Sequence, residues 1–328
     1  WAVDSKSFYY VKLDDNHRPL RVFHHKLGNP QDNDRLVYEE ANPGWFTHIH
    51  ESASGRFCVI AGGDHETSEQ SLIDLSQDNA TPRRVSARED GVQYSVADRG
   101  DEIFILTNAD GAIDFRIATA PLNAPDRNNW RDLIPHRAGV YILDFELYAN
   151  HLVRLERENA LPAAIIRDLR SGEEHAIAFD EAAYSLDTLG GYEFETTNLR
   201  FSYSSMTTPS EVFDYDMEKR TRALRKRQEI PSGHNPADYV TTRIMATTQD
   251  GAQVPVSILY RKDTAIDGKA PLLLYGYGSY GHAMPASFAA NRLSLVDRGF
   301  VYAIAHIRGG SDKGWCWYLD GKREKKTN

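Results

Sequence analysis

The chain has 328 residues, of which 41% are hydrophobic and 26% carry a charge. These proportions are ordinary for globular proteins, and the length suggests about two domains. The net charge of −9 argues against nucleic acids and anionic membranes as partners, and no stretch approaches the ~20 apolar residues of a membrane span. Cys58 and Cys316 stand alone in different regions, as in proteins of a reducing compartment, so we expect a cytoplasmic location.

From residue 1 to about residue 228, short apolar strands recur at a nearly constant interval. The cores of these predicted strands are Phe8–Val11, Phe57–Ile60, Ile103–Leu106, Leu152–Leu155 and Leu199–Tyr203. Successive cores begin 49, 46, 49 and 47 residues apart, and a second apolar strand follows each core. Because a period of roughly 40–50 residues is typical of propeller blades, the pattern predicts five blades of a β-propeller. A pair of β-sandwich domains would also contain short strands, but such domains need no constant period.

Two features of this half look like binding sites. His48 and His50 form a His-x-His pair on a predicted strand, a spacing that zinc sites use, but no third ligand lies at a fitting spacing. We therefore expect no metal site there. The basic residues from Lys219 to Arg227 are interpreted as a solvated last strand that leads into a linker.

The remaining residues are predicted to start a second domain. Residues 229–238 contain two prolines and a glycine and are predicted to be an interdomain linker. The segments Tyr239–Thr247 and Val254–Tyr260 alternate between apolar and other residues on either side of an Asp-Gly turn, which predicts an antiparallel hairpin.

Two continuous apolar runs follow, Pro271–Tyr275 and Phe300–Ala305. A run without alternation is typical of a parallel strand with both faces covered, so we predict two buried parallel strands joined by a crossover helix over Ser287–Arg298. Each run ends in a glycine loop, at residues 276–281 and 308–310. Ligands of parallel sheets bind beyond the carboxyl ends of the strands, so these loops are where chemistry is expected.

Tyr277 is the candidate catalytic residue of the first loop. Gly276 and Gly278 flank it, which lets the backbone approach a bound molecule closely and leaves a phenol projecting from a strand end. A neutral phenol in this place can donate a hydrogen bond to a developing oxyanion, and one such donor is worth roughly 10²–10³ in rate. The alternative is that Tyr277 packs against the following helix and its hydroxyl binds a carbonyl.

Several motifs resemble the prolyl oligopeptidase family of serine peptidases. They are the run LLLYGYGSYG and the run FVYAIAHIRGG within residues 271–310, and the segment Trp317–Lys322. Tyr203–Pro209 and Trp1–Lys6 are similar to the oligopeptidase B (protease II) branch of that family. The resemblance covers almost the whole chain and implies that Tyr277 supplies one donor of an oxyanion hole. It also implies a fold of about five of seven propeller blades followed by the N-terminal part of an α/β-hydrolase domain, acting on short peptides without a cofactor or metal.

The resemblance suggests that the chain is an internal piece of a longer enzyme. The expected parts are a partial propeller over residues 1–228, the linker over 229–238 and the start of the catalytic domain over 239–328. No Gly-x-Ser-x-Gly elbow occurs, since Ser279 and Ser311 each lack one of the two glycines. In the resembled family the triad Ser, Asp and His all follow the second glycine loop, so we expect them beyond residue 328.

The sequence departs from the family pattern in two places. In oligopeptidase B the loop after the oxyanion tyrosine often carries two aspartates that hold a basic residue at the second substrate position. Those places correspond to the uncharged Pro285 and Ser287, our candidate substrate-binding residues. A preference for paired basic residues is thereby put in doubt. The second loop has Arg-Gly-Gly-Ser-Asp at residues 308–312 where relatives have Arg-Gly-Gly-Gly-Glu, which would alter how it meets the propeller.

Three functions are compatible with the sequence. The first is a serine oligopeptidase that cleaves short peptides after Arg or Lys, with the propeller restricting substrate size. The second is a prolyl or acylaminoacyl peptidase on the same fold, and the third is a propeller binding module with an inactive hydrolase remnant. The motifs favour the first, and a Gly-x-Ser-x-Gly elbow after residue 328 would distinguish an enzyme from a scaffold.

We expect residues 1–328 alone not to hydrolyse an arginyl chromogenic ester above background, because no nucleophile elbow lies within them. The measurement is the release of the chromophore by the isolated piece. A stoichiometric burst that labels a serine within these residues would contradict this expectation.

Overall fold

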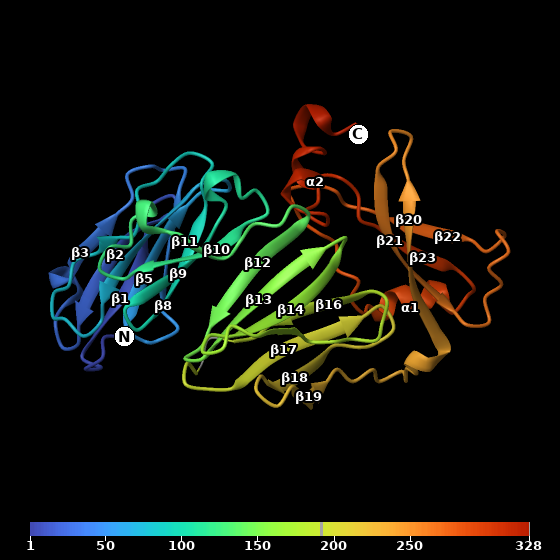
Figure 1. The fold of residues 1–328 in the computed structure, drawn as a ribbon, viewed down its shortest axis with the longest axis horizontal. Helices are drawn as coiled ribbons and strands as arrows, with labels where there is room; N and C mark the ends of the chain where they lie inside the picture. Colours follow the sequence, from blue (N-terminus) through green and yellow to red (C-terminus); the bar gives the residue numbers. More distant parts are fainter. Residues whose placement is uncertain (191–192, 328) are drawn as a thin grey trace. The chain divides into compact units, whose positions relative to one another are not determined.

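The computed structural model describes residues 1–190 and 193–327, and it divides into two compact units (Figure 1). The first unit contains residues 1–136 and two short segments, and the second contains most of residues 137–327. Nearly all the regular structure is antiparallel sheet, and in the first five sheets the strands pair in the order in which they occur along the chain.

The first unit holds three sheets. Their strands are β1 (Ser7–Leu13), β2 (Pro19–Lys26) and β3 (Arg35–Glu39); β4 (Phe46–Glu51), β5 (Phe57–Gly63), β6 (Ser68–Asp74) and β7 (Arg83–Arg84); and β8 (Tyr94–Arg99), β9 (Glu102–Thr107), β10 (Arg116–Pro121) and β11 (Arg131–Ile134). Three single turns of 3-10 helix connect them, namely η1 (Gln31–Asn33), η2 (Ala109–Gly111) and η3 (Arg127–Asn129).

Strand β5 shows why these sheets stack. Its side chains alternate between two faces, because successive residues of a strand point in opposite directions. Cys58 and Ile60 pack with Val22 of the preceding sheet, whereas Phe57 and Val59 pack into the core that includes residues of β8 and β9. Both faces are therefore buried, which explains why the second strand of each repeat is an almost continuous apolar run.

The second unit continues the series with two more four-stranded sheets. Their strands are β12 (Val140–Leu147), β13 (His151–Glu158), β14 (Leu161–Asp168) and β15 (Glu174–Ala176); and β16 (Tyr184–Thr188), β17 (Asn198–Ser205), β18 (Glu211–Asp216) and β19 (Thr221–Arg227). All five strand cores expected from the repeat lie in strands, one to each sheet, so the predicted series of five is confirmed. Strand β19 is exposed at every residue, and Arg225 and Arg227 pair with acids of β18, as expected for a solvated last strand.

A sixth sheet follows η4 (Pro236–Asp238) and has the order β20-β21-β23-β22. Its strands are β20 (Tyr239–Thr247), β21 (Gln253–Arg261), β22 (Leu272–Tyr275) and β23 (Val301–Ala305), and the helices are α1 (Ala290–Val296), α2 (Trp315–Leu319) and the 3-10 turn η5 (Arg323–Lys325). The predicted hairpin and the parallel pairing of β22 with β23 are confirmed. Leu293 and Val296 of α1 pack in a cluster with Ile304, whereas Trp317 of α2 packs in a separate cluster with Ala303. Because Ala303 and Ile304 are adjacent in β23, the two helices cover opposite faces of the sheet.

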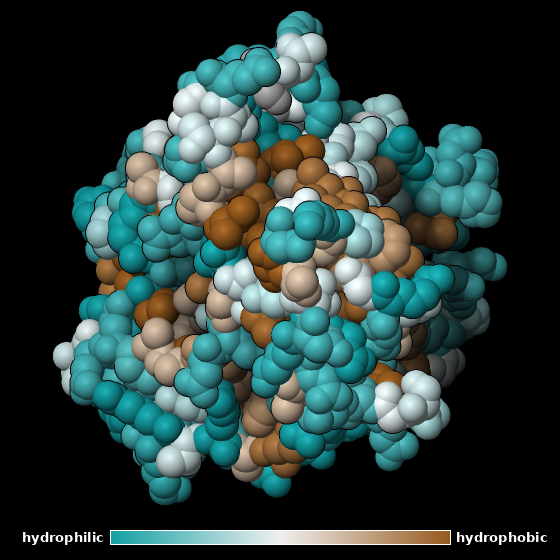
Figure 2. Space-filling view, turned by 90° about the vertical axis from the view of Figure 1, so that its right-hand side faces the viewer, coloured by the Kyte–Doolittle hydropathy of each residue, from teal (hydrophilic) through white to brown (hydrophobic). Residues whose placement is uncertain are grey.

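The prediction that both apolar runs are buried is wrong for the first one. Strand β22 is exposed at all four residues, while β23 is buried at its three central residues. The reason is position in the sheet, because β22 lies at the edge and α1 packs over β21 and β23. Figure 2, which faces the side where this sheet lies, shows hydrophobic side chains gathered on that surface. Helix α1 is also shorter than the expected Ser287–Arg298.

Candidate active site

Two glycine-rich loops follow the parallel strands β22 and β23 and pack against each other. The first loop, residues 276–281, carries Tyr277, and the second loop covers residues 306–312. The amide of Gly281 donates to the carbonyl of Gly309 over 2.9 Å, so the end of the first loop is bonded to the middle of the second. Parallel strands end at the same edge of a sheet, which is why these two loops meet.

The contact between the loops requires glycine on both sides. A Cβ on Gly278 would lie 2.5 Å from Cγ1 of Ile307, and a Cβ on Gly309 would lie 2.0 Å from the carbonyl oxygen of Gly278. Both glycines also have positive φ angles, 60° and 92°, which other residues rarely adopt. The sequence suggested that glycines beside Tyr277 permit close approach to a bound molecule. In the structure, the close neighbour of Gly278 is the second glycine loop.

Tyr277 presents its phenol to the surface of the loop. The residue is 44% exposed, and its ring lies 5.8 Å from the His282 ring at an angle of 87°. Its hydroxyl has no hydrogen-bond partner among the residues that the structure describes, which does not match the alternative that the hydroxyl binds a carbonyl. The phenol is therefore available as a donor to a bound molecule.

A buried chain of three side chains supports the second loop. His306 Nδ1 lies 2.9 Å from Asp312 Oδ1, and His306 Nε2 lies 2.9 Å from Ser257 Oγ. This is the hydrogen-bond order of a catalytic triad, and sequence reasoning missed it because Ser257 lies 49 residues away. The three residues are only 1–2% exposed, so a substrate cannot reach the serine. The three hydrogen-bonded side chains therefore fix the second loop to β21 and β23.

The other serines and histidines near the loops also have structural partners. Ser311 is 4% exposed, and its hydroxyl donates to the carbonyl of Gly281 over 2.6 Å. His234 Nε2 donates to the carbonyl of Thr207 over 2.6 Å, which ties the linker to the last of the five sheets. His282 contacts Tyr277, and the carbonyl of Ser279 accepts from the His282 amide. None of these arrangements forms an accessible nucleophile and base.

Pro285 and Ser287, the predicted substrate-binding residues, lie between the first loop and α1 on either side of the buried Ala286. Pro285 is exposed and lines a cavity of about 470 Å³. That cavity is also lined by His282 of the same segment and by Asp187 on β16. Ser287 uses its carbonyl to accept from Arg292, and it does not line the cavity. The structure thus places Pro285, but not Ser287, beside an open space.

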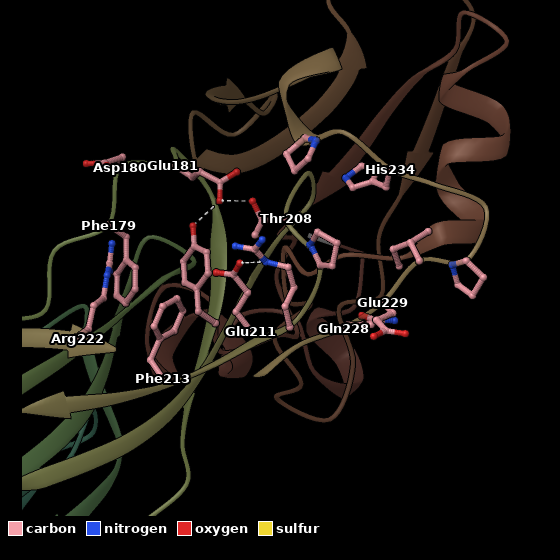
Figure 3. Close-up of a pocket in the computed structure, with 16 residues that line it drawn as sticks. Phe179, Asp180, Glu181, Thr208, Glu211, Phe213, Arg222, Gln228, Glu229 and His234 are labelled. Atoms are coloured by element: carbon pink, nitrogen blue, oxygen red, sulfur yellow. Dashed lines mark hydrogen bonds and ion pairs between the residues drawn. The ribbon is translucent and has the colours of Figure 1, made fainter. Parts of the chain in front are cut away.

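A second cavity, of about 870 Å³, lies between the sheet β16–β19 and the linker (Figure 3). Glu181 accepts hydrogen bonds there from Tyr203, Ser205, Thr207 and Thr208. Burial, followed by the nearby Glu181 carboxylate, raises the pKa of Tyr203, so its hydroxyl stays protonated and donates. These hydroxyls belong to the Tyr203–Pro209 motif, and they hold the turn that contacts the linker through His234.

Residues 1–190 and 193–327 hold no cluster of three His, Cys, Asp or Glu side chains that could bind a metal. No helix in those ranges has the length and hydrophobicity needed to cross a membrane.

Comparisons with known proteins assign two parts of the chain to one family. Residues 1–228 match the prolyl oligopeptidase N-terminal beta-propeller domain, and residues 286–328 match the prolyl oligopeptidase family. The chain is 39% identical to dipeptidyl aminopeptidase BI of Pseudoxanthomonas mexicana and 29% identical to protease 2 of Moraxella lacunata. Both alignments include 100% of this chain, but only 45% and 47% of those proteins.

Solved structures give the same result. Oligopeptidase B from Leishmania major matches 98% of this chain with a TM-score of 0.90 and 33% identity. Oligopeptidase B from Trypanosoma brucei, in its closed form with covalently bound antipain, matches 100% with a TM-score of 0.92 and 32% identity. This chain covers 46% and 48% of those two chains, so it spans about half the length of these relatives. The fold is therefore a β-propeller followed by the start of a hydrolase domain.

We expect Asp312→Ala to lower the free energy of unfolding by about 1–3 kcal/mol, because it leaves the buried Nδ1–H of His306 without an acceptor. The measurement is urea-induced unfolding of the full-length protein. Asp263→Ala is the matched control, since Asp263 is exposed and pairs with Arg261 at the surface. Equal effects of the two substitutions would contradict a supporting role for the buried chain.

Proposed function

Because the chain belongs to the prolyl oligopeptidase family, we propose that the full-length protein is a serine peptidase that hydrolyses short peptides after Arg or Lys. The observation that carries the proposal is Tyr277, a 44% exposed residue just after the parallel strand β22 whose hydroxyl has no hydrogen-bond partner among the described residues. The proposed domains are the partial propeller over residues 1–228, the linker over 229–238 and the start of the catalytic domain over 239–328. The family match over 1–228 supports the first of these boundaries.

In the proposed mechanism, Tyr277 donates a hydrogen bond to the oxyanion of a tetrahedral intermediate. A backbone N–H near the nucleophile supplies the second donor, and the nucleophilic serine belongs to the part of the protein outside residues 1–328. The exposed apolar strand β22 supports the placement of the nucleophile outside these residues, because further strands can pair with an uncovered edge strand. The propeller limits the size of the peptides that reach the site, and the proposed location is cytoplasmic.

The preference for Arg or Lys rests on similarity to the two oligopeptidase B structures. A second candidate is the release of dipeptides from an amino terminus, which is favoured by 39% identity to a protein named dipeptidyl aminopeptidase BI. The two activities differ in whether the substrate needs a free amino group. Prolyl specificity has weaker support, since the relatives with prolyl names are 27–29% identical.

In the full-length protein, we expect Tyr277→Phe to lower kcat on an arginyl substrate by roughly 10- to 10³-fold with little change in KM. The reason is that the hydroxyl acts mainly on the transition state, while the ring packing against His282 is retained. Wild-type and variant enzymes are compared on arginyl, prolyl and acetyl-alanyl substrates, and on dipeptidyl-arginyl substrates with free or acetylated amino groups.

An unchanged kcat would show that Tyr277 packs against its neighbours and does not stabilise the oxyanion. Absence of activity on every substrate in a protein with an intact fold would favour the non-catalytic binding module. Activity only on unblocked dipeptidyl substrates would select the dipeptide-releasing alternative.

Pro285 and Ser287 stand where acids would attract a basic substrate residue. Because neither side chain carries a charge, wild-type kcat/KM for Arg-Arg and Ala-Arg substrates should agree within a few-fold, roughly the effect of an exposed ion pair. We expect the double variant Pro285→Asp, Ser287→Asp to raise the Arg-Arg preference by about 5- to 30-fold if bound substrate partly desolvates the new carboxylates.

A wild-type enzyme that already prefers Arg-Arg strongly would show that other acids form this subsite. Asp187 would then be the first residue to replace, because it is exposed and lines the same cavity as Pro285. The matched control is Asp180→Asn, which lies in the other cavity.

A further inference from the structure

The turn between β13 and β14 is held in a costly backbone conformation. Asn159 and Ala160 both have positive φ angles, 49° and 65°, and a left-handed alanine costs about 1–2 kcal/mol. In this conformation the Ala160 amide donates to the carbonyl of Asp312 over 2.7 Å, and the guanidinium of Arg243 donates to the carbonyl of Asn159. The turn of a blade-like sheet is therefore bonded both to the second glycine loop and to strand β20.

Arg157, just before this turn, makes an unusual contact. Its Nη1 donates to Ser311 Oγ over 3.0 Å and to the Ser311 carbonyl over 3.3 Å. Arg157 forms no ion pair with any of the described residues, and burial lowers the pKa of its guanidinium. Asp312 and Asp187 attract the charge without accepting a hydrogen bond from it, and a mostly buried cation that is hydrogen-bonded only to neutral oxygens is expensive.

Ser311 connects Arg157 by hydrogen bonds to the loop that carries Tyr277. A serine hydroxyl has one hydrogen, and Ser311 gives it to the Gly281 carbonyl over 2.6 Å. The hydroxyl can then only accept from Arg157, so the three groups form a directed chain from Arg157 through Ser311 to Gly281. Hydrogen bonds in such a chain polarise and strengthen one another.

Gly281 is the last residue of the first loop, and both its amide and its carbonyl form hydrogen bonds. Its amide donates to Gly309, and its carbonyl accepts from the Ser311 amide as well as from the hydroxyl. Tyr277 itself has one aromatic neighbour, His282, and no hydrogen bond to a described residue. The place of its hydroxyl therefore depends on the backbone contacts at Gly278 and Gly281 more than on packing of its ring.

We propose that Arg157 and Ser311 are positioning residues that couple the β13–β14 turn of the propeller to the oxyanion donor Tyr277. Loss of either contact lets the first loop move away from the second and misplaces the hydroxyl. The proposal rests on the proposed role of Tyr277, but the coupling between the turn and the loop can be measured without activity.

A double-mutant cycle in the full-length protein tests the kinetic part. Arg157→Met keeps most of the apolar stem, and Ser311→Ala removes only the hydroxyl. Each should lower kcat about 10-fold with KM changed less than about 2-fold, because a misplaced donor loses part of its transition-state stabilisation. In a Tyr277→Phe background, each should cost less than about 2-fold, because the donor that they position is already absent.

Arg167→Met is the matched control, since Arg167 lies on the same hairpin and pairs with Glu174 over 3.0 Å. It should leave kcat unchanged. Equal losses from Arg157→Met with and without the Tyr277 hydroxyl would overturn the proposal, because the arginine would then act independently of Tyr277. The absence of any loss in the wild-type background would overturn it as well.

Hydrogen exchange provides the readout that does not need activity. In the full-length protein, Arg157→Met should speed amide exchange in a peptide covering residues 276–283 several-fold and leave residues 151–156 unchanged. Unchanged exchange over 276–283 would refute the coupling. Faster exchange in a protein without peptidase activity would preserve the coupling and refute the proposed function, so the two failures can be distinguished.

Discussion

The backbone contact between the two glycine loops is the constraint on which the candidate site depends. A Cβ on Gly309 would lie 2.0 Å from the Gly278 carbonyl oxygen, so no side chain fits between the loops. Parallel strands β22 and β23 bring both loops to one edge of the sheet, and Tyr277 takes its place from this contact. Whatever holds the second loop therefore also holds Tyr277.

Buried polar groups provide that support, and their burial determines what they can do. Ser257, His306 and Asp312 have the hydrogen-bond order of a catalytic triad, but they are almost completely inaccessible. Fully paired buried groups rigidify a structure, whereas a catalytic serine must meet its substrate. The same hydrogen-bond order therefore has a structural role here because a substrate cannot reach the serine, and not because the hydrogen-bond distances are unsuitable.

The junction between the last of the five sheets and the next domain uses a similar principle. Glu181 accepts hydrogen bonds from four hydroxyl groups of residues 203–208, which fixes the turn after β17. That turn then contacts the linker at His234 and the segment before α1, where the Phe288 amide donates to Ser204 Oγ. One carboxylate in the loop before β16 therefore organises contacts to two other segments.

The features that depend on local pattern could be predicted from the sequence. The series of five sheets follows from a repeat of apolar strands, and the hairpin β20–β21 and the two glycine loops follow from alternation and turn residues. These signals come from neighbouring residues, whose spacing reflects the geometry of a strand. Tyr277 could be singled out in the same way, because glycines flank it directly.

Which surfaces are covered, and which distant groups meet, depends on the folded chain and could not be predicted from local pattern. The run Leu272–Tyr275 has the same apolar character as Val301–Ala305, yet it lies at the sheet edge and is exposed, since burial depends on neighbours in space. Arg157 meets Ser311 across 154 residues of chain, and Gly278 meets the second loop rather than a bound molecule. Such contacts carry no periodic signal, because chain folding, and not local spacing, brings the partners together.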